Sequence, residues 1–152
     1  MDKPQNKFQK DLQAGQLGER LVGGILKKNL GAAALKFNAT QSHDFELHFA
    51  DGRVQTFEVK TDFAAQKTGN SYLEYECSDK PSGLFATKAD QWVILLQHIK
   101  TFYVFSPTDM MKVLSTLKLR QVKGGDSYRA RGFLLPILTL DGLPFVQKNT
   151  YE

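Results

Sequence analysis

Two runs of alternating apolar and polar side chains, joined by a short turn, make up residues 44–60, DFELHFADGRVQTFEVK. Alternation with a period of two predicts strands with one buried face, and the Asp-Gly pair predicts a tight turn between them. Residues 44–60 therefore predict a β-hairpin. This hairpin constrains the fold more than any other segment, because its two apolar faces must coincide if they are to share one core.

The register of the hairpin decides whether its acidic residues share a face. Glu58 and Lys60 are two positions apart, so both project from the same side of their strand. A two-residue turn would put Asp44 and Glu58 on opposite faces, because a slip of one residue flips every side chain. A three-residue connection over 50–52, with Gly52 in a left-handed conformation or a bulge, pairs Asp44 with Glu58. We predict the three-residue connection.

The segment before the hairpin, residues 8–30, predicts a long amphipathic helix. One helical stripe, with spacings of four and three, holds Phe8, Leu12, Gly15, Glu19, Val22 and Leu26. A carboxylate in such a stripe is costly to bury without a partner. Two interpretations of Glu19 follow: either another group meets it, or it lies at the edge of the stripe and reaches water.

The remaining chain predicts short elements of both kinds. Residues 32–39 suit a strand, although their alanines also suit a helix, and Ser106 with Pro107 indicates the start of a helix that extends to about residue 118. Prolines at 136 and 144 favour edge or irregular structure in the tail. Further strands are expected at 72–77, 92–97 and 101–106, and a short helix within 81–91. We predict a mixed α/β fold and a single domain spanning residues 1–152.

Composition and charge limit the partners and the cellular compartment that are expected for this chain. The chain has a formal charge of +4 and a sequence pI near 9.1, which permits a polyanionic partner. Residues 1–152 show no apolar run long enough to cross a bilayer, and the first eleven show no apolar signal segment, so we expect a cytoplasmic protein that does not enter a membrane. The single cysteine, Cys77, agrees with a reducing compartment.

The predicted convergence of Asp44 and Glu58 at a strand end favours a hard divalent cation, Mg²⁺ or Mn²⁺, which prefers oxygen ligands. Such an ion polarises a phosphate and lowers the pKa of a bound water. Lys60, on the same face, is placed to stabilise the negative charge that develops on a phosphoryl group. The pattern predicts phosphodiester hydrolysis.

These residues resemble the active site of the PD-(D/E)xK nuclease superfamily, which includes restriction enzymes and archaeal Holliday-junction resolvases. The resemblance covers about residues 15–97, although His43 stands where the motif's name has proline. It implies a restriction-endonuclease-like mixed central sheet flanked by helices, and a Mg²⁺-dependent DNA endonuclease. The roles it implies are metal binding by Asp44, Glu58 and the carbonyl of Val59, assistance to the attacking water by Lys60, and a catalytic contribution from Glu19.

Residues 69–96 are also similar to small phage-encoded nucleases of this superfamily, which would place the protein in the host cytoplasm. That resemblance implies a metal ligand at Glu74 and substrate contacts at Asn70 and Ser82. The alternatives are an exposed sheet edge for Glu74 and a helix cap for Ser82. From their expected positions in or beside loops we predict DNA contacts for Lys88, Arg129 and Arg131, against the simpler interpretation that they are solvated surface charges.

Three functions compete at this stage. The first is a metal-dependent DNA endonuclease, acting on branched or structured DNA as resolvase-like relatives do. The second is a non-catalytic nucleic-acid-binding protein of the same fold, and the third is a structural protein whose Asp44, Glu58 and Lys60 form an ion-paired sheet face. A symmetric junction needs two active sites, so a homodimer is expected for that substrate, with the apolar tail or residues 101–106 as its face.

Overall fold

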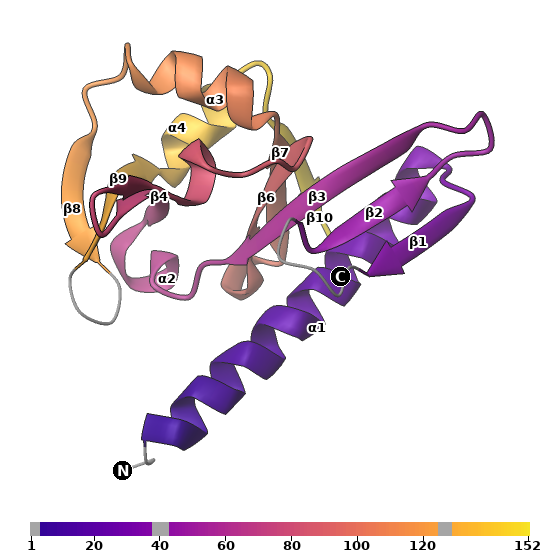
Figure 1. Ribbon diagram of the computed structural model, residues 1–152, viewed down its shortest axis with the longest axis horizontal. Coiled ribbons are helices and arrows are strands. Elements are labelled where there is room, and N and C mark those ends of the chain that lie inside the picture. The colour runs from indigo at the N-terminus through magenta and orange to yellow at the C-terminus, as the bar shows by residue number, and fades with distance from the viewer. Residues whose placement is uncertain (1–3, 38–42, 125–128) are drawn as a thin grey trace.

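The computed structural model describes residues 4–37, 43–124 and 129–152, which form two β-sheets and their flanking helices (Figure 1). The first sheet has six strands, in the spatial order β1 (Ala34–Phe37), β2 (Phe45–His48), β3 (Val54–Thr61), β6 (Gln91–Leu96), β7 (Thr101–Phe105) and β10 (Gln147–Thr150). Within it β3 and β6 run parallel, and the other neighbouring pairs are antiparallel. The expected mixed α/β fold is confirmed.

A second, antiparallel sheet of four strands faces part of the first. Its spatial order is β5 (Lys80–Pro81), β4 (Asn70–Cys77), β9 (Ala130–Pro136) and β8 (Arg120–Gly124). The prediction of edge or irregular structure for the tail was wrong in this part, because β9 is an inner strand. Pro136 is tolerated there as the last residue of the strand, where it lies opposite Asn70.

The long N-terminal helix, α1 (Pro4–Leu30), is confirmed and begins four residues earlier than expected. Its C-terminal half packs Val22 and Leu26 onto the first sheet, whereas its first turns extend away from both sheets (Figure 1). Phe8 is accordingly 68% exposed and Leu12 52%. The helix ends at Gly31, whose positive φ of 68° gives the left-handed residue that commonly closes a helix.

The other helices are short. They are α2 (Ala65–Thr68), the 3₁₀ turns η1 (Gly83–Phe85) and η2 (Gln97–Ile99), α3 (Pro107–Leu114) and α4 (Ile137–Gly142). The predicted start of α3 is confirmed, since the Asp109 N–H donates to the Ser106 hydroxyl at 3.5 Å. The helix expected within 81–91 shrinks to η1, because Gly83 takes a left-handed φ of 53° and sits against the backbone of Glu74.

Two apolar clusters cover the two faces of the first sheet. One joins α1 to β2, β3, β6 and β7, and the other joins β6 and β7 to the second sheet, α3 and α4. Every residue of β7 is buried. The suggestion that residues 101–106 form a dimer face was therefore wrong, because β6 and β10 flank β7 and both of its faces are covered. Within the described ranges, no helix is long and apolar enough to cross a membrane.

Candidate active site

The predicted register of the hairpin is confirmed. Phe45 lies opposite Phe57, and their rings stack with centroids 4.8 Å apart. At the turn, the Phe49 N–H donates to the Arg53 carbonyl at 2.9 Å, and Gly52 has a positive φ of 89°. Asp44, one position before Phe45, lies beside Glu58, because it hydrogen-bonds to Phe57 and Val59 on either side of that residue.

Asp44 closes the hairpin at the point where β2 begins. Its own N–H donates to the Phe57 carbonyl at 2.9 Å, and its Oδ2 accepts from the Val59 N–H at 2.7 Å. The carboxylate thus takes the hydrogen bond that a longer β2 would have made. Because the N–H and C=O of one strand residue point to the same edge, the Val59 carbonyl is also directed to the edge of β3 that Asp44 contacts.

Glu58 and Lys60 lie together on the face of β3 opposite α1. The Lys60 Nζ is 3.3 Å from Glu58 Oε1, and it also stands 5.6 Å above the ring centre of Trp92. Burial raises the pKa of Glu58; the Lys60 charge opposes this rise, and the Asp44 charge adds to it. Lys60 is the more exposed of the pair, at 53% against 20% for Glu58, so its ammonium group can reach a substrate.

Glu19 reaches this cluster from α1. Burial raises its pKa to about 7, with further contributions from the negative charges of Asp44 and Glu58. The approach depends on Gly18, since a Cβ there would lie 2.7 Å from the Thr61 hydroxyl on β3. Glu19 is therefore met by other charged groups, as one of the two interpretations expected. Two of them, Asp44 and Glu58, carry the same charge as Glu19, and the third, Lys60, carries the opposite charge.

The arrangement is suited to a hard cation. Carboxylates from α1, β3 and the start of β2 converge with a backbone carbonyl, and all are oxygen donors. Over the described part of the chain, no group of three or more His, Cys, Asp or Glu side chains is already set around a common metal position. Mg²⁺ does not require one, because it commonly binds through one or two carboxylates and retains several waters. A cation there would also offset the repulsion from neighbouring carboxylates, which adds to the effect of burial on the pKa values of Glu19 and Glu58.

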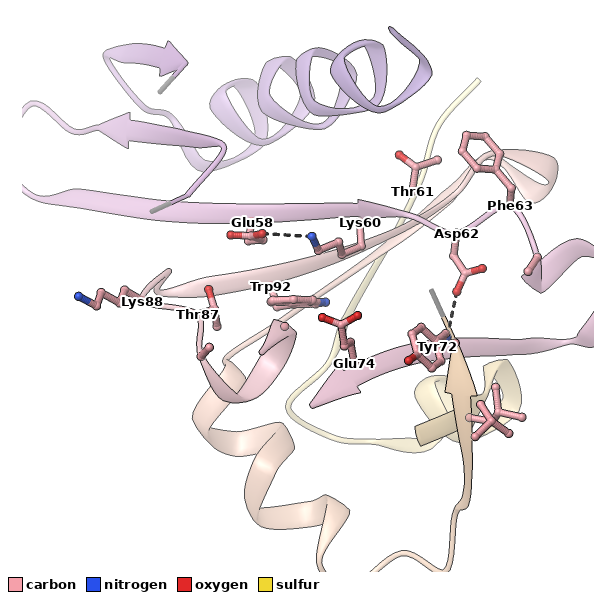
Figure 2. A pocket seen from close by; sticks show the side chains of 16 residues that line it. Glu58, Lys60, Thr61, Asp62, Phe63, Tyr72, Glu74, Thr87, Lys88 and Trp92 are labelled. Atoms are coloured by element: carbon pink, nitrogen blue, oxygen red, sulfur yellow. Dashed lines mark hydrogen bonds and ion pairs between the residues drawn. The ribbon is translucent and has the colours of Figure 1, made fainter. Parts of the chain in front are cut away.

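A cleft of about 930 Å³ opens beside Glu58 and Lys60, between the two sheets (Figure 2). Glu74 projects into it from β4, and Lys88 lies at its rim on the segment after η1. Glu74 therefore shares a cleft with the site but comes from the opposite wall. Trp92, on β6, lines the cleft and was missed from sequence, because its strand is apolar on both faces and gives no sign of which face is open.

Four other predicted contacts lie apart from the cluster. Asn70 donates from its amide to the Thr68 carbonyl at 3.3 Å, and Ser82 makes no side-chain cap bond to η1. Arg129 is exposed just before β9. Arg131 lies opposite Lys123, and strand alternation puts both on the face away from the cleft.

Arg120 shares the cleft face instead, since it lies opposite Leu134, which lines the cleft. His43, which precedes Asp44, donates from Nε2 to the Glu46 carboxylate at 3.1 Å.

No family model matches this sequence, and no curated protein sequence matches it. Among solved structures, the chain is similar to a bacterial homing endonuclease, with a TM-score of 0.48 and 18% sequence identity. The similarity covers 64% of this chain and 70% of that one. Because this similarity is low, it carries no conclusion about the function of the site.

Proposed function

We propose that the protein is a metal-dependent DNA endonuclease that hydrolyses phosphodiester bonds. One observation supports the proposal: Asp44 hydrogen-bonds to the residues on either side of Glu58, and Glu19 and Lys60 lie close to both carboxylates. As a structural ion pair, Lys60 and Glu58 would contribute only about 0–1 kcal/mol at this exposure. Stability alone does not explain why three carboxylates should converge.

In this proposal the metal is held by Asp44, Glu58 and the Val59 carbonyl. When bound there, Mg²⁺ or Mn²⁺ would polarise the phosphate and supply a water of lowered pKa. Glu74, on the opposite wall, would bind the metal only through an intervening water or substrate.

The chain's own groups supply the proton transfer and the charge stabilisation. The Glu19 carboxylate, which lies close to Asp44 and Glu58, can accept a proton from the attacking water. The Lys60 ammonium, 3.3 Å from Glu58, can then stabilise the charge that grows on the phosphoryl oxygens. Water adds to phosphorus and gives one proton to Glu19, and one P–O ester bond breaks. The departing oxygen takes a proton from solvent, to which Glu19 returns its own.

The test is cleavage of labelled linear, nicked, single-stranded and four-way-junction DNA with Mg²⁺, Mn²⁺ or EDTA. Asp44→Asn is preferred to alanine, because its amide oxygen can still accept from the Val59 N–H. Asp44→Asn and Lys60→Ala should each lower the rate by about 10²-fold or more. Lys36→Ala, which removes an exposed lysine on β1, is the matched control and should cleave normally.

Cleavage that survives in both Asp44→Asn and Lys60→Ala would refute the mechanism. Binding without cleavage of all four DNA forms would instead indicate the non-catalytic nucleic-acid-binding function. Preference for the four-way junction, together with a dimer in solution, would support the resolvase-like substrate expected from sequence.

A further inference from the structure

The cleft beside the site has aromatic walls and two buried polar side-chain atoms that lack a hydrogen-bond partner. Among the described residues, four buried side-chain polar atoms lack a hydrogen-bond partner. Two of them line this one cleft, namely the Tyr72 hydroxyl and Trp92 Nε1, whereas Thr61 Oγ1 faces α1 at Gly18. Buried donors are normally paired, so their concentration here indicates a surface whose partners are supplied by a ligand.

Trp92 is the strongest of these indications. Its side chain is 2% exposed, and its indole N–H can only donate. Lys60 covers one face of the ring, with Nζ 5.6 Å from the ring centre. A group that enters the cleft to accept from Trp92 therefore lies next to Lys60, at the end of the cleft that holds the proposed reacting phosphate (Figure 2).

Tyr72 forms a flat platform on the second sheet. A Cβ at Gly132 would overlap its ring, and one at Gly124 would lie 3.2 Å from its hydroxyl. The two glycines, on neighbouring strands, let the ring lie across the sheet with its other face toward the cleft. Such an arrangement offers a stacking surface with a hydroxyl at one edge.

These features define the ligand chemically. It is a planar group that can stack on Tyr72, with polar edges for the Trp92 and Tyr72 donors and for the Glu74 carboxylate, and it is joined to a phosphate near Lys60. A nucleobase in a DNA strand has all of these properties. A base paired within a duplex does not reach such a pocket, because its edges are occupied and its faces are stacked.

We propose that the cleft receives one or two unstacked nucleotides beside the phosphodiester bond that is cut, so that the preferred substrate is DNA with unpaired nucleotides at that position. The volume of about 930 Å³ lies in the range of small-molecule pockets, which suits a short single-stranded segment. This inference rests on the proposed nuclease function and adds the substrate class to it.

Binding can be tested without cleavage, since Trp92 is the only tryptophan in the chain and its fluorescence reports on the cleft. The protein is titrated in EDTA with a single-stranded tetranucleotide and with an abasic tetramer of equal charge. We expect the base-bearing strand to change the fluorescence and to bind about tenfold more tightly, in line with the contribution of one stacked base. Equal affinities, or no change in fluorescence, would overturn the proposal.

Variants of Tyr72 separate stacking from charge. Tyr72→Leu should remove most of the preference for the base-bearing strand, whereas Tyr72→Phe keeps the ring and should retain most of it. Tyr75→Phe is the matched control, because that hydroxyl donates to Gln121 at 2.8 Å, outside the cleft lining. A Tyr72→Leu protein that is folded by circular dichroism but keeps the full preference would contradict the assigned platform.

Cleavage then distinguishes this inference from the function on which it rests. A duplex with a two-nucleotide unpaired segment should be cut at least tenfold faster than the fully paired duplex, and abasic sugars in that segment should remove the advantage. If Lys60→Ala abolishes cleavage but paired and unpaired DNA are cut equally, the nuclease proposal stands and this one fails. If no DNA is cut, the nuclease proposal fails, and with it the assignment of the cleft to a cleavage substrate.

Discussion

Replacing Glu19 by glutamine should make the protein more stable at pH 8 than the wild type. Burial and the neighbouring carboxylates raise the pKa of Glu19 from 4.5 to about 7 in the folded state. Each pKa unit corresponds to about 1.36 kcal/mol, so ionising this group in the folded protein costs about 3 kcal/mol before solvent screening. Glu19 is half-buried, and screening by water reduces the expected gain to about 1–2 kcal/mol.

The pH window follows from the sign of the shift. A carboxyl whose folded-state pKa is raised binds more protons in the folded than in the unfolded state between its two pKa values. The wild type should therefore lose stability relative to Glu19→Gln as the pH rises from about 4.5 to about 7, with a constant difference above that range. Below it, the glutamic acid is neutral in both states and the gap should close.

Urea unfolding at pH 4, 6 and 8 in EDTA measures this difference directly. Glu46→Gln is the opposite control, because hydrogen bonding to His48 lowers the pKa of Glu46, so its loss should decrease stability near neutral pH. A Glu19→Gln protein no more stable than the wild type at pH 8 would show that the carboxylates do not repel one another as the geometry requires. Cleavage by Glu19→Gln should fall, whatever its stability.

Three further outcomes are expected. Gly18→Ala should lower the free energy of unfolding by about 1–3 kcal/mol, because its Cβ would lie 2.7 Å from a hydroxyl on β3. Chemical denaturation measures this loss. Gly24→Ala, with open space around it, is the control and should show no loss. Hydrogen bonding from Tyr103 at 2.7 Å lowers the pKa of Asp141, so Asp141→Asn should lose about 1 kcal/mol at pH 7. The difference in stability between Asp141→Asn and the wild type should disappear as the pH falls through the lowered pKa of Asp141. A loss of stability that does not depend on pH would refute the link between this pKa and folding. Mg²⁺ at ten times its dissociation constant should stabilise the wild type by about 1.4 kcal/mol, as a rise in thermal midpoint, and an equal rise in Asp44→Asn would exclude the proposed metal position.

The hairpin could be predicted from sequence because its information is local. Alternation over residues 44–60 identifies both strands, and the position of Gly52 selects the turn that sets Phe45 opposite Phe57. For Glu19 the sequence indicated only an unusual carboxylate in a helical stripe. Its partners could not be assigned, because they depend on where α1 crosses β3, and that crossing is set by packing at Gly18.

The second sheet could not be predicted, because its strands are brought together from distant parts of the chain. β4 pairs with β9, and the pairing relies on Gly132 to admit the ring of Tyr72. A glycine in a short apolar run that ends in proline indicates a loop when only neighbouring residues are considered. Because β9 was not predicted as a strand, the side of the sheet on which Arg131 lies could not be predicted either. Alternation assigns a side chain to one face only after the strand is known.

The order of the elements along the chain has a consequence for biosynthesis. Glu19, Asp44, Glu58 and Lys60 all belong to the first half of the sequence, and β6 and β7 complete their support before residue 106. The opposite wall of the cleft draws Val122, Gly124 and Leu134 from β8 and β9. A nascent chain that has emerged only as far as β7 therefore carries the charged groups of the site and the part of the opposite wall that β4 supplies, but it lacks the part that β8 and β9 supply.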